Sequence, residues 1–191
     1  MRKLTYFVAA SIDGLIAASD GSIAPFFPLP DGLLDHLVAA YPETLPTSFR
    51  ESLGVTVPNG RFDTVIQGRA TYEPALAEGI TSPYAHLEQY VVSGSLADTG
   101  DPAVHVLADP VAAVKDLKSR DGLGIWLAGG SRLAGSLFAE IDELIVKVYP
   151  LVLGTGKPMF AGDVDPTRLT LADSEVIGTG GALVQRYTVS R

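Results

Sequence analysis

The strongest constraint on the fold of this chain is a change of pattern near residue 142. Before it, short apolar runs rich in β-branched residues alternate with segments of helical periodicity, which indicates strands separated by covering helices. After it, only strand-like segments follow, at 142–149, 168–177 and 182–189, and Gly178–Gly181 is typical of a hairpin turn between the last two. The sequence therefore predicts an α/β fold with a mixed, mainly parallel sheet, flanking helices and antiparallel C-terminal strands, in a single domain spanning 1–191.

The individual elements follow from local patterns. Two runs, Val65-Ile66 and Ile125–Leu127, are apolar at every residue, which fits central strands covered on both faces. Asp109 and Pro110 form an N-cap and first-turn signature for one helix. The proline-rich segment 41–60 is predicted to be an inserted loop with one or two helical turns. The expected strands before the change of pattern are Leu4–Ala9, Thr64–Ile66, Tyr90–Val92, Val104–Leu107, Ile125–Leu127 and Leu144–Tyr149, and the expected helices cover 31–41, 71–77, 109–117 and 133–141.

Composition and charge exclude several classes of function. With 14 Lys and Arg against 22 Asp and Glu, the net charge is −8, and without a basic cluster we expect no nucleic-acid or membrane partner. The chain has no cysteine, so a thiolate nucleophile is excluded, and its three histidines lack the spacing of a metal site. The basic-then-apolar start resembles a signal peptide, but polar residues interrupt it from Ser11 onwards, and we expect a cytoplasmic protein.

Two junctions between a strand and a helix are candidate phosphate sites. Each carries glycine and then arginine, at Gln67-Gly68-Arg69-Ala70-Thr71 and at Ala128-Gly129-Gly130-Ser131-Arg132. A helix N-terminus offers unpaired N–H groups and a positive dipole end, and glycine lets the backbone approach an anion closely. Two such sites on neighbouring strands would suit a diphosphate, whereas the alternative is that glycine only makes each turn tight.

A third junction ends a strand in Ser93 and Ser95, which could bind a ribose phosphate or could simply bond the turn backbone. Other nucleotide motifs do not fit. There is no G-x-G-x-x-G after a strand, and Gly154–Pro158 resembles a P-loop end with proline at the metal-holding position.

Five segments, in order and spacing, resemble the dihydrofolate-reductase-like superfamily, and most of all the reductase half of the bifunctional riboflavin-biosynthesis deaminase-reductases and its stand-alone bacterial relatives. The segments are Val8–Ala17, Gly68–Glu73, Val92-Ser93, Ile125–Gly130 and Pro150–Phe160. This resemblance implies a reductase that uses NADPH and transfers a hydride to an electron-poor carbon of a small-molecule substrate.

The resemblance also implies roles for individual residues. Ala9 and Ile16 match positions that contact the nicotinamide, and Ser11–Ala17 matches the loop that closes over the cofactor. By this resemblance three groups of residues would bind the phosphates of the cofactor: Gly68, Arg69 and Thr71 the pyrophosphate and the adenosine 2′-phosphate at one helix N-terminus, Ser93 and Ser95 the 2′-phosphate, and Gly129, Gly130, Ser131 and Arg132 the pyrophosphate at the other helix N-terminus.

The proton source departs from the family pattern. Folate reductases carry the pattern Pro-Trp-x-Leu-Pro-x-acid, in which the acid protonates the pterin. This chain has Pro25-Phe26-Phe27-Pro28-Leu29-Pro30-Asp31-Gly32 instead, so no residue can be matched to that acid. The candidate proton donors are Asp13 and Asp31, with Asp35 nearby, and Asp31 is alternatively the N-cap of the helix that follows it.

The sequence is therefore consistent with two functions. The first is an NADPH-dependent reductase acting on a heterocyclic, imine or carbonyl substrate, and the second is a nucleotide-binding or ligand-sensing protein that keeps the fold without turnover. We also expect a homodimer, with the apolar segment Val148–Leu153 either between subunits or in the core.

Overall fold

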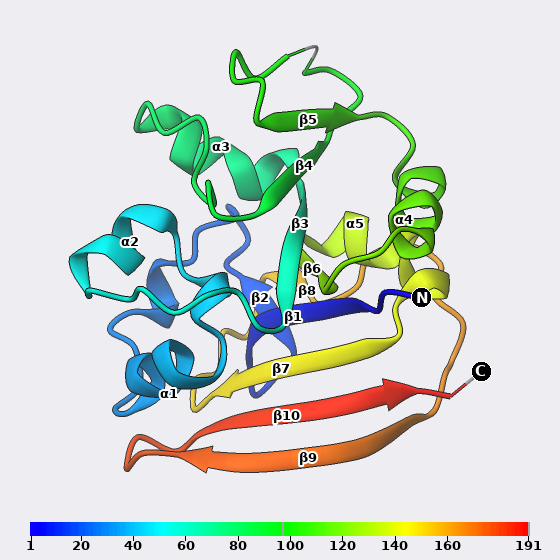
Figure 1. Cartoon of the computed structure of the whole chain (residues 1–191). Coiled ribbons are helices and arrows are strands. Elements are labelled where there is room, and N and C mark those ends of the chain that lie inside the picture. Colours follow the sequence, from blue (N-terminus) through cyan, green and yellow to red (C-terminus); the bar gives the residue numbers. More distant parts are fainter. Residues whose placement is uncertain (97, 191) are drawn as a thin grey trace.

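A computed structural model describes residues 1–96 and 98–190, and its centre is an eight-stranded sheet (Figure 1). The strand order is β5-β4-β3-β6-β1-β7-β10-β9, so β9 and β5 form the two edges. All neighbouring pairs from β5 to β7 are parallel, and β10 pairs antiparallel with both β7 and β9. The predicted fold class is confirmed. The strands are β1 (Leu4–Ser11), β3 (Phe62–Gly68), β4 (Glu88–Val92), β5 (Val104–Leu107), β6 (Gly124–Gly129), β7 (Glu143–Tyr149), β9 (Leu169–Ile177) and β10 (Ala182–Val189).

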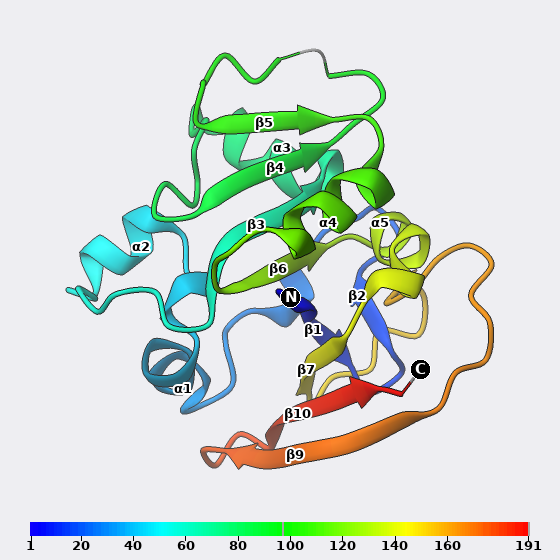
Figure 2. The same ribbon diagram turned by 45° about the vertical axis from the view of Figure 1, so that its right-hand side comes forward.

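Helices cover both faces of the sheet, and Figure 2 shows α4 in front of β3 and β6 with α3 behind β4. On one face, α4 and α5 pack Val114, Leu117 and Leu133 against a core that includes Tyr6 and Leu127. On the other face, α1 packs against Phe7, Trp126 and Ile145 among others. The helices are α1 (Leu33–Ala40), α2 (Thr47–Ser52), α3 (Arg69–Ala77), α4 (Pro110–Ser119) and α5 (Ser131–Ser136), with short 3₁₀ turns η1 (Ala24–Phe26), η2 (Pro42–Thr44) and η3 (Phe138–Glu140).

Several local predictions are confirmed. The Asp109 carboxylate accepts hydrogen bonds from the backbone N–H groups of Val111 and Ala112, at 3.1 and 3.0 Å, and so caps α4. β6 lies between β3 and β1, as its uninterrupted apolar sequence predicts. The segment 41–60 is a loop with two short helical pieces, η2 and α2, and residues 178–181 connect β9 to β10.

Two predictions need correction. Asp31 is not the N-cap of α1, because Gly32 occupies that position and no side chain caps the helix. The predicted helix over 133–141 is two pieces, α5 and η3. A further small sheet was not predicted: β2 (Leu15–Ala17) pairs antiparallel with β8 (Lys157–Pro158), and a Cβ at Gly156 would lie 2.2 Å from the Ala17 carbonyl oxygen. Such a close approach of two backbones leaves no visible local sequence pattern.

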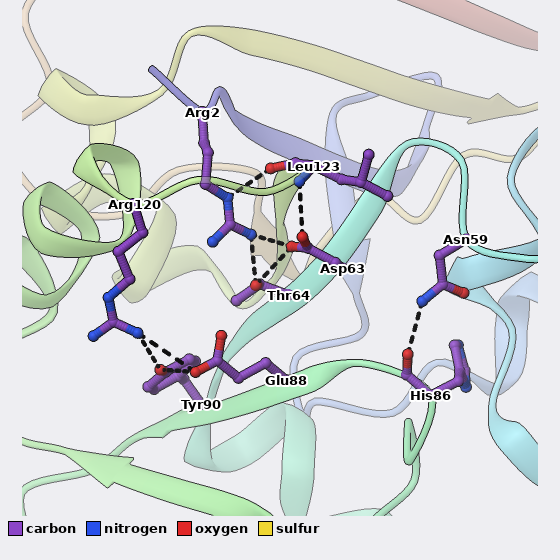
Figure 3. A network of polar contacts seen from close by, with 9 residues as sticks. All are labelled: Arg2, Asn59, Asp63, Thr64, His86, Glu88, Tyr90, Arg120 and Leu123. Carbon is purple, nitrogen blue, oxygen red and sulfur yellow. Dashed lines mark hydrogen bonds and ion pairs between the residues drawn. The ribbon is translucent and has the colours of Figure 1, made fainter.

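The amino ends of the central strands are closed by a network of charged side chains (Figure 3). The Arg2 guanidinium is paired with Asp63, donates to Thr64 Oγ1 at 2.6 Å and donates to the Leu123 carbonyl at 2.6 Å. Asp63 also accepts from the Leu123 N–H at 2.7 Å. These contacts join the start of β1 to β3 and to the residue before β6, so they hold the three strands together at their amino ends. No helix in the described part of the chain is long and apolar enough to cross a membrane.

Candidate functional site

The two glycine junctions lie side by side at the carboxyl ends of β3 and β6. The strands are neighbours in the sheet, with Gln67 in register with Gly129. A Cβ built on Gly68 would lie 3.6 Å from the Gly130 nitrogen, and one built on Gly129 or Gly130 would lie 3.8 Å from Thr71 Oγ1. Gly129 has a φ of +126°, and the Gly129–Gly130 peptide is cis. The glycines therefore leave open a cradle that Cβ atoms would begin to fill.

Helices begin at both junctions without a side-chain cap. Gly68 is the N-cap residue of α3 and Gly130 that of α5, and neither helix receives a side-chain hydrogen bond at its N-cap. The first N–H groups of a helix have no partner within the helix, so they are available to an acceptor from outside. The neighbouring Gln67 is buried, and its Nε2 has no hydrogen-bond partner among the described residues.

Arg69 and Ser95, both predicted to face a 2′-phosphate, are brought together. The Arg69 guanidinium donates to Ser95 Oγ and, through Nε, to Glu73 Oε1 at 2.6 Å. The Arg69 side chain is 48% exposed, so it can turn from these partners to an anion in solution. Ser93 has a different arrangement, because its Oγ accepts from the N–H groups of Ser95 and Leu96 at 3.2 and 2.9 Å. Its oxygen therefore organises the turn that presents Ser95.

On the other side of the cradle, Ser131 is tied to the segment that carries β8. Its hydroxyl donates to the Pro158 carbonyl, and its own carbonyl accepts from the Ala161 N–H at 3.0 Å. The backbone of α5 and that of the segment after β8 pack closely, since a Cβ at Gly135 would lie 1.9 Å from the Ala161 carbonyl oxygen. Arg132 is exposed at the start of α5. The Ser131 side chain thus positions the junction, and the Arg132 side chain faces solvent beside it.

Ala9 and Ile16 lie near the end of β1 and in the loop that follows it. Ala9 packs at the margin of the α1-facing core, whereas Ile16 packs against the core on the opposite face. The loop between them is fixed at Ser11, whose Oγ both accepts from the Leu15 N–H and donates to the Leu15 carbonyl, at 3.0 and 3.2 Å.

Asp13 anchors this loop to the segment after β7. Its two carboxylate oxygens accept from the backbone N–H groups of Leu153 and Gly154, at 3.1 and 2.7 Å. Hydrogen bonding by Ser11 and then by these backbone groups lowers the pKa of Asp13 to about 2. At neutral pH the side chain is ionised and has no proton to donate. The structure gives Asp13 an anchoring contact, and its predicted catalytic role stays a prediction.

Asp31 is bound to the hairpin between β9 and β10. Its Oδ2 accepts from Thr179 Oγ1 at 2.7 Å, and this hydroxyl, followed by the Thr179 N–H, lowers the pKa of Asp31. The approach is close here too: a Cβ at Gly178 would lie 2.2 Å from the Asp31 carbonyl oxygen. Asp31 is thus also ionised at neutral pH, and its side chain is directed to the hairpin.

Lys147 is the residue that sequence analysis missed. It lies on β7 opposite Ala9 of β1, and its Nζ is 4.4 Å from the centroid of the Phe7 ring. Burial lowers the pKa of Lys147 to about 8, and no ion pair or hydrogen bond of its ammonium is present in the described structure. The signal was available, because Lys147 alternates with Ile145 and Tyr149, both buried, and so falls on an apolar face.

Comparison with known proteins places this geometry in a family. The model of the RibD C-terminal domain matches residues 66–183, which include both glycine junctions. The chain belongs to the RibD C-terminal domain family. It is 33% identical over 180 residues to the uncharacterized protein YwjB of Bacillus subtilis (strain 168), covering 93% of each chain.

Solved structures support the same fold for this RibD C-terminal domain protein. A Shewanella protein described as a riboflavin biosynthesis protein superposes with a TM-score of 0.71 at 22% identity, over 100% of both chains. Dihydrofolate reductase from Enterococcus faecalis, solved in complex with NADP(H), superposes with a TM-score of 0.64 at 17% identity, over 99% of this chain and 97% of that chain. The fold is therefore dihydrofolate-reductase-like, as the sequence motifs predict.

Proposed function

We propose that this protein is an NADPH-dependent reductase that transfers a hydride to an imine or carbonyl carbon of a small heterocyclic substrate. The observation that carries the proposal is the meeting of two uncapped helix starts at one glycine cradle, with Arg69 and Ser95 beside it. Its family membership and its likeness to a reductase solved with NADP(H) support the same assignment.

The residues present fit this cofactor. At the paired junctions no Cβ covers the backbone of Gly68, Gly129 and Gly130, so a diphosphate could accept hydrogen bonds from the N–H groups of the two helix starts. Arg69 and Ser95 together offer a cation and a hydroxyl to a 2′-phosphate. NADPH, when bound, would supply the hydride, and the protein would orient the substrate and exclude water.

A titration of the protein with NADPH and NADH, followed by cofactor fluorescence, tests the proposal. For Arg69→Ala we expect a loss of NADPH affinity of roughly 10- to 100-fold, the range for a hydrogen bond to a charged group, and little change for NADH. Arg168→Ala, at an exposed arginine next to β9, is the matched control and should change neither affinity. An absence of saturable NADPH binding to the wild-type protein would contradict the proposed function, and equal losses for both cofactors would remove Arg69 from the 2′-phosphate site.

A second candidate function is cofactor binding without turnover, as in a sensor. It is favoured by the hydrogen bonding of Asp13 and Asp31, which keeps both carboxylates ionised at neutral pH. Single-turnover measurements distinguish the two functions, with a panel of pterins, flavin precursors and carbonyl compounds added to the NADPH complex. A reductase loses the absorbance of the reduced nicotinamide with at least one compound, whereas a sensor keeps it with all of them.

A further inference from the structure

Lys147 is a cation on the interior face of the sheet that no described group neutralises. β7 carries Ile145, Lys147 and Tyr149 on the face covered by α1, and the flanking two are 0% and 5% exposed. Lys147 pairs with Ala9 on β1 and with Val184 on β10, so its neighbours in the sheet are apolar on both sides. A charge at such a position costs stability unless something compensates it.

The nearest compensation is an aromatic ring. The Lys147 Nζ lies over Phe7, and Phe7 in turn contacts Tyr41 and Trp126, with ring centroids 4.8 and 6.4 Å away. A cation over an aromatic face is stabilised by about 0.5–2 kcal/mol, but the ring cannot accept the three N–H bonds of an ammonium group. Donor capacity is therefore left at this position.

Other charged and titratable groups lie on the elements packed against this face. On β7 and β10, Glu143 pairs with Arg186 at 3.5 Å. On α1, His36 Nδ1 lies 3.7 Å from Glu175, and Asp35 is on the exposed side of the helix. Around Tyr41, the Arg61 guanidinium lies 4.8 Å from the ring centroid, and Asp173 of β9 is a further charged neighbour. The phenols on this face include Tyr41, Tyr84 and Tyr149, and burial raises the pKa of each, so that all three are neutral at pH 7. Among these cations, Lys147 is the one in register with Ala9 of β1.

The position of Lys147 relative to the proposed cofactor indicates which class of substrate it would bind. In the proposed function Ala9 contacts the nicotinamide, and Lys147 lies directly across from Ala9 on the adjacent strand. We propose that Lys147 binds the electronegative end of the reducible bond, so that the substrate is an oxo-heterocycle or another planar carbonyl compound with anionic character. A basic, amino-substituted heterocycle would instead meet a like charge there. This inference rests on the proposed function.

The same group completes the proton balance of the reduction. Hydride addition to the carbon of a C=O or C=N bond breaks the π bond and leaves an electron pair on the oxygen or nitrogen. The Lys147 ammonium donates a proton to that atom, becomes a neutral amine, and regains a proton from water. The reductant is the reduced nicotinamide of the proposed function.

A matched pair of probes tests the inference: lumazine, which is a dioxopteridine, and a diaminopteridine with the same ring system. Each is titrated calorimetrically into protein saturated with NADP⁺, which cannot reduce them. We expect the wild-type protein to prefer lumazine, and Lys147→Met to lose roughly 10- to 100-fold of lumazine affinity, as expected for a hydrogen bond to a charged group. Lys147→Arg should retain the preference because it retains the charge.

The controls separate this inference from the function on which it rests. NADP⁺ affinity, measured first, should be unchanged in Lys147→Met, and Lys115→Met, at a lysine whose side chain is 64% exposed on α4, should behave as wild type throughout. If the wild-type protein shows no preference for lumazine, or if the preference survives in Lys147→Met, the assignment of Lys147 is overturned while cofactor binding stands. If NADP⁺ itself fails to bind, the proposed function fails first.

Discussion

Replacing Lys147 by methionine should make the protein more stable at neutral pH. Methionine has nearly the same length as lysine and packs well against aromatic rings such as Phe7, so the change removes the charge of this half-buried residue and leaves the volume almost unaltered. A side chain retained for ligand binding commonly costs stability in this way. The size of the gain follows from the pKa of Lys147.

Burial lowers that pKa from 10.5 to about 8. At about 1.4 kcal/mol for each pKa unit, the protonated side chain destabilises the folded state by about 3 kcal/mol, and we therefore expect Lys147→Met to be more stable by about 2–3 kcal/mol at pH 7. In a chain of this size each kcal/mol raises the melting temperature by about 2–4 °C, so the expected increase is about 4–12 °C.

The pH dependence provides the sharper test. Between pH 8 and 10.5 the folded protein has lost the Lys147 proton and the unfolded chain still holds it, so wild-type stability rises with pH across this window. The difference from Lys147→Met should therefore be constant below pH 8 and shrink steadily above it. Urea unfolding of both proteins from pH 6 to 10, with Lys115→Met as control, measures this difference. A variant less stable than wild type, or a difference independent of pH, would refute the reasoning.

Two further predictions concern close contacts around the cradle and the loop. Gly135→Ala places a Cβ against the Ala161 carbonyl and should lower the free energy of unfolding by about 1–3 kcal/mol, measured by thermal unfolding. Gly94→Ala is the control, because a Cβ there meets nothing within 4 Å, and it should leave the stability unchanged. Equal stability of the two variants would contradict the packing of α5 against Ala161. Asp13→Asn weakens the acceptor for the N–H groups of Leu153 and Gly154 and should speed their hydrogen exchange at neutral pH. Because the pKa of Asp13 is about 2, the wild-type contact should persist until the pH falls towards that value. A loss of protection of these two N–H groups, relative to their exchange rate in an unfolded chain at the same pH, already near pH 5 would contradict it.

Much of the fold could be predicted because its signals are local. Short apolar runs, the Asp109-Pro110 cap and the glycine turn at 178–181 depend on residues close in sequence, and the structure has strands, a helix and a hairpin at these positions. β2 and β8 were missed for the opposite reason. They are three and two residues long, and they are joined by an approach of backbones about 140 residues apart, at Gly156 and Ala17.

The residues of the candidate site also differ in whether their signals are local in sequence. The glycine junctions could be located from sequence because a strand, a glycine and a helix start are consecutive, and the parallel sheet then places them side by side. The contacts of Asp13 and Asp31 could not, since their partners are Gly154 and Thr179, more than 100 residues away. Lys147 could have been found by strand alternation, but its proximity to Ala9 depends on the register of β7 against β1.

The charges of Asp13, Asp31 and Lys147 bear on the acid that folate reductases have and this chain lacks. In the proposed reduction the proton would come from a different group. Asp13 and Asp31 are both ionised at neutral pH and both accept hydrogen bonds that fix loops, so neither has a proton to donate to a heterocycle. Lys147 carries the opposite charge on the face that would meet the substrate, and at neutral pH it is in its acidic form. A site built in this way selects against the basic ring that a buried carboxylate would favour and selects for an electron-rich oxygen, so the change of acid predicts a change of substrate.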